Sequence, residues 1–298
     1  MKRKLLMMMI GAVLTVSCDN TNSNKKENTK PSVTATTAAS VAKTAKKYQA
    51  ELITVPATVK ANENAALTIK LKNPEGEAVK DLQIAHEKIM HLLVISKDLN
   101  EFYHLHPDAQ PDGSLMVKHK FPSGGDYKLF ADFTPANAEQ TVASVDLKVA
   151  GKERKPERTV IDTFFSKTLE NLSVVLDAGK GLRAGEESML TYKLTDAKTN
   201  KPVTNLQKYL GEDAHFVIVS DDLKEFVHAH PMKVEPVASP TPAAKRSKDD
   251  IQVKPSTDIM AHVVFPVAGT YKIWAQFQRA DKIITVPFIV SVDERKEK

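Results

Sequence analysis

The stretch HLLVISKDLNEFYHLHP, residues 91–107, occurs a second time as HFVIVSDDLKEFVHAHP, residues 215–231. Each copy begins with a run of aliphatic residues, passes through a Ser-x-Asp-Leu turn and returns as Phe-x-His-x-His-Pro. A run, a turn and a second run of this kind are typical of a β-hairpin. Self-similarity over such a distance indicates a duplicated structural unit. We therefore expect two copies of one domain.

A second block supports the duplication, because residues 116–133 align with residues 260–277 without a gap. About seven short segments of each copy are rich in β-branched and aromatic residues, and Gly, Pro, Asn and Asp turns separate them. In the first copy these segments are 50–55, 66–71, 91–96, 102–106, 115–121, 126–133 and 142–149. The pattern predicts an all-β protein with two tandem immunoglobulin-like β-sandwich domains. We expect Tyr127 and Tyr271, which follow Pro-x-x-Gly-x, to tie a corner back to the backbone.

The composition of the connecting segments predicts the domain boundaries. We expect a signal peptide at 1–17, a flexible tether at 18–47, a first sandwich at 48–150, a linker at 151–158 and a second sandwich at 159–293. Residues 234–255 are rich in Pro, Ala and Lys and are expected to form a long loop inside the second sandwich.

The N-terminus has the layout of a secretory signal. Three cationic residues precede an apolar run that is too short to span a membrane, and the run ends at Cys18, the only cysteine of the chain. This arrangement resembles a bacterial lipobox, although Thr15 stands where such sites usually carry Leu. We expect lipidation of Cys18, a membrane anchor through that lipid and an extracytoplasmic location, whether at the inner or the outer membrane. An ordinary signal with an accidental cysteine is the alternative.

The net charge gives little support for nucleic acid as a partner. The formal charge is +5, and loss of Lys2, Arg3 and Lys4 with the signal would leave about +2. No stripe of alternating basic and aromatic residues is present. We therefore expect no nucleic acid partner.

Histidines carry the candidate chemistry. Residues two apart on a strand point to the same face, so His104 with His106 and His228 with His230 can converge on one metal ion. His91 and His215 begin the preceding strands and can add a third nitrogen to each site. If the strands that follow pair beside these histidines, they also bring Met116 in the first copy, and Met260 and His262 in the second. Imidazole with thioether favours copper, with zinc as an alternative.

A structural interpretation of the same residues stays open, whereas an enzymatic one lacks support. Phe102 and Phe226 share the parity of the histidine pairs, so the imidazoles could face the core and only form structural hydrogen bonds. The sequence also lacks a repeated carboxylate beside the histidines, since Met232 replaces Asp108 in the second copy, and it lacks a nucleophile elbow and a phosphate loop. We therefore expect no enzyme.

The repeated segments, each followed by Pro-x-x-Gly-x-Tyr-Lys, resemble the YtkA-like group of small secreted immunoglobulin-like domains and, more distantly, CopC-type copper carriers. The resemblance implies an exported β-sandwich and a role in copper handling, by buffering or by delivery to a partner protein. The N-terminal histidine of CopC-type sites is missing, so any copper site has to be built from the strand histidines. A non-catalytic module that binds protein or glycan is the alternative function.

Overall fold

The computed structural model describes residues 47–155, 159–232 and 258–296. The expectations for the signal peptide, Cys18, nearly all of the tether and the loop at 234–255 lie outside these residues. In the described part of the chain the regular elements are strands. No described segment forms a helix that is long and apolar enough to cross a lipid bilayer.

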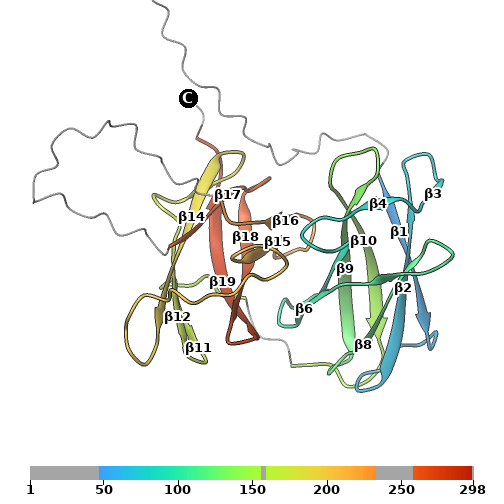
Figure 1. Ribbon diagram of the computed structural model, residues 1–298, viewed down its shortest axis with the longest axis horizontal. Coiled ribbons are helices and arrows are strands. Elements are labelled where there is room, and N and C mark those ends of the chain that lie inside the picture. Colours follow the sequence, from blue (N-terminus) through green and yellow to red (C-terminus); the bar gives the residue numbers. More distant parts are fainter. Residues whose placement is uncertain (1–46, 156–158, 233–257, 297–298) are drawn as a thin grey trace, which may run out of the picture. The chain divides into compact units, whose positions relative to one another are not determined.

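The first sandwich comprises ten strands in two sheets (Figure 1, blue to green). One sheet has the order β1-β2-β8-β7, with β3 beside β2, and the other has the order β10-β9-β5-β6, with β4 beside β9. The bounds are β1 Gln49–Val55, β2 Asn64–Lys72, β3 Ala78–Val79, β4 Leu82–Gln83, β5 His91–Ser96, β6 Phe102–Leu105, β7 Asp108–Ala109, β8 Leu115–Lys120, β9 Gly125–Pro135 and β10 Thr141–Val149.

The second sandwich repeats this arrangement with nine described strands (Figure 1, yellow to red). Its sheets have the orders β11-β12-β14-β17 and β13-β19-β18-β15-β16. The bounds are β11 Ser166–Leu169, β12 Leu172–Asp177, β13 Leu182–Arg183, β14 Glu187–Asp196, β15 His215–Ser220, β16 Phe226–Ala229, β17 Ile259–Val264, β18 Gly269–Arg279 and β19 Lys282–Asp293. The prediction of an all-β protein with two tandem immunoglobulin-like sandwiches is confirmed.

Each sandwich has its own apolar core between its two sheets. The predicted tyrosine corners close both cores. The Tyr127 hydroxyl lies 3.0 Å from the Ser123 carbonyl oxygen, and the Tyr271 hydroxyl donates to the Val267 carbonyl oxygen at 2.9 Å. Tyr127 also donates to the buried Glu101 carboxylate at 2.6 Å. The conserved spacing of Pro, Gly and Tyr within the repeat therefore has a structural role.

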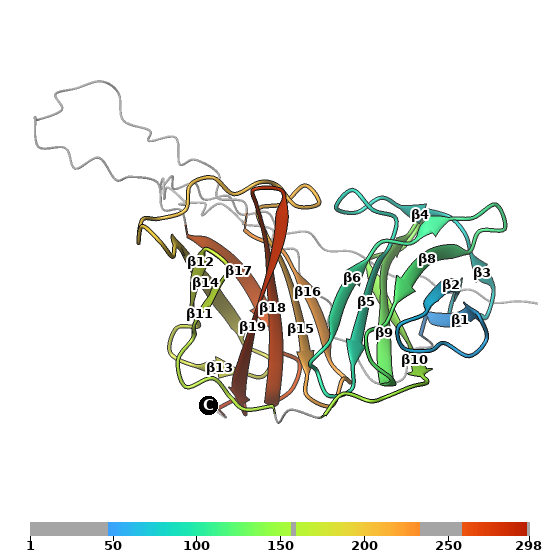
Figure 2. The same ribbon diagram turned by 90° about the horizontal axis from the view of Figure 1, so that it is seen from below.

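The central hairpin of each copy is set by its Ser-x-Asp-Leu turn. Ser96 Oγ accepts the backbone N–H groups of Asn100 and Glu101, and Leu99 adopts a φ of 60°. The second copy repeats the turn, with Ser220 accepting from the backbone of Lys224 and Glu225. The turn returns β6 beside β5, as Figure 2 shows, and the antiparallel register places His104 across from Leu93. The turn thus places the histidines of β6 next to the start of β5.

Strands β5 and β15 are buried on both faces, which is unusual for antiparallel sheets, since one face of such a sheet commonly lies in solvent. Leu92 and Val94 point into the first core. The alternate residues Leu93 and Ile95 point out of the sandwich, where they join a third apolar cluster. This cluster draws equivalent residues from both sandwiches: Leu93, Ile95, Leu99 and Phe130 with Val217, Val219, Leu223 and Trp274, and with Phe102 and Phe226 packed against them.

Two aromatic stacks link the equivalent strands of the two copies. Phe102 stacks on Trp274 with ring centroids 4.7 Å apart, and Phe226 stacks on Phe130 at 4.8 Å. Each such pair contributes about 0.5–1.5 kcal/mol beyond the apolar area that it buries. In addition, Lys272 Nζ donates to the Leu99 carbonyl oxygen at 2.6 Å. The third cluster therefore docks the sheet of β5 and β6 against the sheet of β15 and β16.

Candidate metal centre

The strand histidines lie on this docked face. His104 pairs with Leu93 and His228 pairs with Val217, so both share a face with the third apolar cluster. The shared parity of Phe102 and the histidines is therefore as expected. The face is the outer side of the sheet, however, and not the core of the sandwich. The histidines thus face the third apolar cluster and not the core of their own sandwich, while His91 and His215 do hydrogen-bond backbone carbonyl oxygens, as the structural interpretation expects.

In the first copy His91, His104 and His106 form a group of three, with one ring nitrogen of each within 4.8 Å of the others. His91 Nδ1 lies 2.9 Å from His104 Nε2. The ring centroids of His104 and His106 are 4.7 Å apart, and those of His91 and His106 are 5.2 Å apart. This group is called the N-terminal triad below.

In the second copy His215, His228 and His230 form the equivalent group, again within 4.8 Å. His215 Nδ1 lies 3.3 Å from His228 Nε2, and the rings of His228 and His230 have centroids 4.6 Å apart. This group is called the C-terminal triad. The repeat therefore preserves the geometry of the site as well as its residues.

In four of the imidazoles, the ring nitrogen that points away from the triad donates a hydrogen bond to an oxygen that can only accept one. His91 Nε2 donates to the Ala85 carbonyl oxygen at 3.1 Å, and His215 Nε2 donates to the Tyr209 carbonyl oxygen at 2.8 Å. His104 Nδ1 donates to Gln276 Oε1 at 2.7 Å. His228 Nδ1 donates to Asp132 Oδ2 at 2.6 Å. These contacts fix the neutral tautomers of the four rings.

With those tautomers, each close contact inside a triad joins two lone pairs. His91 Nδ1 and His104 Nε2 both lack a proton, so neither can donate to the other across 2.9 Å. The same holds for His215 Nδ1 and His228 Nε2. Two facing lone pairs repel each other unless a cation lies between or beside them. The outer hydrogen bonds thus prepare both triads to hold a cation.

His106 and His230 add a further sign of a site. The Nε2 atom of each is buried and has no hydrogen-bond partner in the described part of the chain. A buried polar atom without a partner costs about 1–3 kcal/mol. A metal ion in each triad would satisfy the Nε2 atom of that triad.

The electrostatics of the triads keep the imidazoles neutral. Burial, followed by repulsion from neighbouring histidines, lowers the pKa of His104 and of His228 well below the usual value. Burial likewise lowers the pKa of His106 to about 4 and that of His215 to about 3. Neutral imidazole is the form that binds a metal ion, so at neutral pH the triads do not need to release protons first.

The two triads lie next to each other, and each accepts an orienting hydrogen-bond partner from the opposite sandwich. The ring centroids of His91 and His228 are 5.3 Å apart, and those of His104 and His228 are 5.6 Å apart. Gln276 of the second sandwich orients His104, whereas Asp132 of the first sandwich orients His228. Each triad therefore depends on the opposite sandwich for one outer contact.

Three predicted ligands lie elsewhere. Strand β8 pairs with β2 and β7 in the opposite sheet, so Met116 lies across from Thr68 and Asp108 and not across from β6. Strand β17 pairs with β14, which places His262, an exposed residue, across from Met189 and Met260 across from Thr191. The predicted pairing of these strands with the histidine strands is wrong, because in a sandwich the chain crosses to the other sheet after each hairpin.

Three residues of the site were missed by the sequence reasoning. His86 stacks on His230 with ring centroids 3.6 Å apart, and Asp132 and Gln276 orient the triads. Asp132 and Gln276 hold the same position in the second repeated block, opposite His91 and His215. A polar residue at that position of both copies, inside an otherwise apolar strand, was the available signal.

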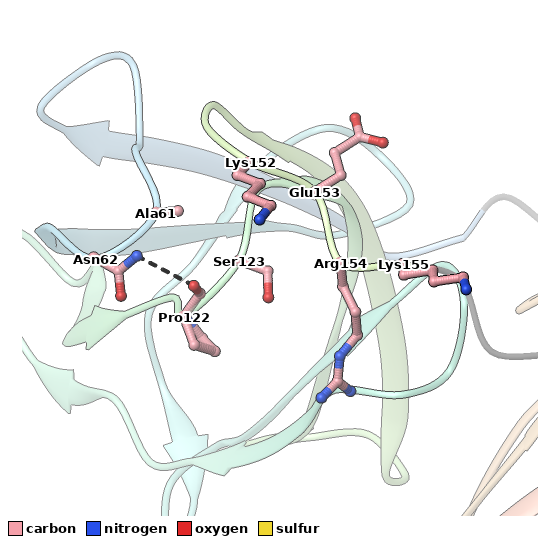
Figure 3. A pocket seen from close by; sticks show the side chains of 8 residues that line it. All are labelled: Ala61, Asn62, Pro122, Ser123, Lys152, Glu153, Arg154 and Lys155. Atoms are coloured by element: carbon pink, nitrogen blue, oxygen red, sulfur yellow. Dashed lines mark hydrogen bonds between the residues drawn. The ribbon is translucent and has the colours of Figure 1, made fainter.

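A separate surface depression of about 380 Å³ lies at the end of the first sandwich (Figure 3). Lys152, Arg154 and Lys155 line it together with Ser123, and Figure 3 shows Glu153 turned away from it. Ser123 Oγ donates to Glu101 Oε1 at 2.5 Å, so this hydroxyl already serves the buried carboxylate. No histidine lines the depression. We assign it no chemistry.

One family model matches the chain in two places, at residues 43–151 and 167–294, which together make up most of its length. The chain belongs to the family described as a domain of unknown function, DUF8832. Each of the two DUF8832 matches contains one histidine triad. No curated protein matches the chain.

Solved structures match the DUF8832 pair at low identity. Salmonella alpha-2-macroglobulin matches with 12% identity over 84% of this chain and 15% of its own, at a TM-score of 0.25. InvD of Yersinia pseudotuberculosis matches with 12% identity over 83% of this chain and 58% of its own, at a TM-score of 0.24. Invasin, a bacterial integrin-binding protein, matches with 14% identity over 84% of this chain and 40% of its own, at a TM-score of 0.21. The chain thus spans less than two thirds of each of these structures.

Proposed function

We propose that this chain is a non-catalytic metal-binding protein that holds one cation in each histidine triad. The observation that supports this most strongly is the pair of triads whose tautomers direct lone pairs at one another, with two further buried ring nitrogens that lack a partner. Three imidazoles with one open position form a common ligand set for transition metals.

Copper in its monovalent state is the cation we propose first. Imidazole ligands suit copper and zinc alike. The triads themselves carry no charge, and Asp132 is the carboxylate in hydrogen-bond contact with them. Burying a cation costs more free energy as its charge rises, so a monovalent ion needs less compensation than a divalent one. The resemblance to YtkA-like and CopC-type domains also favours copper. Zinc is the second metal to be tested.

We also propose that the protein works outside the cytoplasm, anchored through lipid on Cys18. The support is the arrangement of the first eighteen residues, which lie outside the described part of the chain. A tether of the length predicted at 18–47 would let the docked sandwiches exchange metal with a partner protein near the membrane. The role would be to buffer copper or to hand it on.

Equilibrium dialysis tests the proposal. The fragment from Asp19 to Lys298 contains every residue that the structure describes. Dialysed against Cu(I), Cu(II) and Zn²⁺ at micromolar concentration, it should retain close to two equivalents of at least one of these ions, because the repeat provides two triads. Retention of no metal, or of no more metal than a His106→Ala, His230→Ala variant retains, would overturn the proposal.

A module that binds protein or glycan is the second candidate. Invasin, one of the structures that match this chain, is a bacterial integrin-binding protein, and a docked pair of sandwiches can present its loops to a partner. Under this candidate the histidines would only pack. Two bound equivalents of metal in the dialysis would exclude a purely packing role for them.

A further inference from the structure

The two triads are built alike but differ in charge around them. Asp132 lies opposite His91 on β9, and Gln276 lies opposite His215 on β18, so these two residues are equivalent in the repeat. Asp132 contacts His228 and Gln276 contacts His104. The C-terminal triad is therefore backed by a carboxylate, whereas the N-terminal triad is backed by a neutral amide.

Further hydrogen bonds hold the side chains of Gln276 and Asp132 in place. Gln276 Nε2 donates to Thr285 Oγ1 at 3.1 Å, which turns its carbonyl oxygen towards His104. Gln140 Nε2 lies 2.8 Å and 3.0 Å from the two oxygens of Asp132. Only 1% of the Asp132 side chain is exposed, so solvent screens its charge little. A negative charge in a medium of low polarity is thus in hydrogen-bond contact with His228 of the C-terminal triad, and it also acts on His91 of the N-terminal triad, which lies opposite Asp132.

A second charge difference has the same direction. Lys88 and Glu212 occupy equivalent positions in the turns that precede β5 and β15, where Ala85 pairs with Lys88 and Tyr209 pairs with Glu212. Lys88 contributes a positive field at His106, whereas at His91 the negative charge of Asp132 outweighs it. Glu212 lies 3.6 Å from His86 Nδ1, and His86 stacks on His230 of the C-terminal triad. The charges near His106 are thus less favourable to a cation than those near His230.

From these two differences we propose that the triads are unequal, and that the C-terminal triad binds the first and more tightly held cation. Asp132 acts as its positioning residue from the opposite sandwich, by orienting His228 and by strengthening it as a donor. Carboxylates that back a metal-ligating histidine change metal affinity by about 10–100-fold. The inference rests on the proposed metal-binding function and adds an order of filling to it.

Two one-site variants separate the triads for measurement. His106→Ala leaves only the C-terminal triad intact, and His230→Ala leaves only the N-terminal triad intact. Affinity for Zn²⁺ and for Cu(I) is measured in each by competition with a chromogenic chelator. We expect the His106→Ala protein to bind about 10–100-fold more tightly than the His230→Ala protein.

Exchanging the supports tests the role of Asp132 itself. Asp132→Asn in the His106→Ala background should weaken binding by about 10–100-fold, and in the His230→Ala background it should weaken binding less, because the histidine that donates to Asp132 is His228. Gln276→Glu in the His230→Ala background should strengthen binding. A merely structural role for these residues would not produce opposite effects from opposite charge changes. The melting temperature of each apoprotein shows whether the variant has folded.

The outcomes distinguish the two proposals. Equal affinities in the two one-site variants, or equal weakening of both by Asp132→Asn, would overturn the unequal triads and leave the metal-binding function intact. Absence of binding in the unsubstituted protein would overturn the metal-binding function itself.

Discussion

Replacement of both His106 and His230 by alanine should abolish high-affinity metal binding and leave the fold in place. Each substitution removes one of three ligands from a triad. The loss should exceed the 10–100-fold that removal of an outer partner costs. Either substitution alone should halve the metal retained in equilibrium dialysis, because the other triad stays complete.

The same double substitution should change the stability of the apoprotein little. The Nε2 atoms of His106 and His230 have no hydrogen-bond partner in the described part of the chain. Their removal relieves a burial cost of about 1–3 kcal/mol per ring, which offsets the lost packing. Thermal unfolding followed by circular dichroism measures this. A matched control replaces His119 and His262, which lie outside both triads. Full metal retention in the double variant, or equal loss in the control, would show that the ligands are wrongly assigned.

Substitution of Trp274 by alanine should strongly lower the free energy of unfolding. It should also lower the metal affinity of both triads together. The side chain is 4% exposed and stacks on Phe102 in the cluster that docks the two sandwiches. Truncation of a buried aromatic side chain costs about 3–5 kcal/mol. For a protein of this size that corresponds to a fall in melting temperature of about 10 °C. Scanning calorimetry measures the shift.

The expected loss of metal affinity follows from the two hydrogen bonds that join each triad to the opposite sandwich. Gln276 reaches His104 and Asp132 reaches His228 only while the sandwiches stay docked. The matched control is Phe288→Ala, which opens the core of the second sandwich and leaves the docked face untouched. We expect the control to lose stability but to keep two equivalents of metal below its melting temperature. If Trp274→Ala also kept both equivalents at full affinity, the triads would not depend on docking.

Much of the fold follows from local sequence signals. The apolar run at 91–96, the Ser-x-Asp-Leu turn and the Pro-x-x-Gly-x-Tyr corner each specify their structure within a few residues. The histidines at positions 104 and 106 share a face because strand geometry fixes that relation. The addition of His91 and His215 also follows, since each begins the strand on which the hairpin folds back.

The environment of the site depends on contacts between distant residues, which spacing does not reveal. The expected pairing of Met116 with the histidine strand failed because β8 joins the opposite sheet, and local sequence does not determine which sheet a strand joins. A continuous apolar run such as that of β5 is also typical of a strand inside a core. The segment alone therefore does not predict that its outer face packs against a second sandwich. His104 and Gln276 are 172 residues apart, and their contact depends on how the two copies pack.

The most direct test of the paired metal centre is a crystal structure of the metal-loaded protein with anomalous diffraction recorded at the absorption edge of the metal. We expect two anomalous peaks. One should lie about 2.0–2.1 Å from the nitrogens of His91, His104 and His106, and the other at the same distances from those of His215, His228 and His230. Anomalous peaks outside the triads would contradict the account. So would a protein shown to contain metal in which neither triad has a peak.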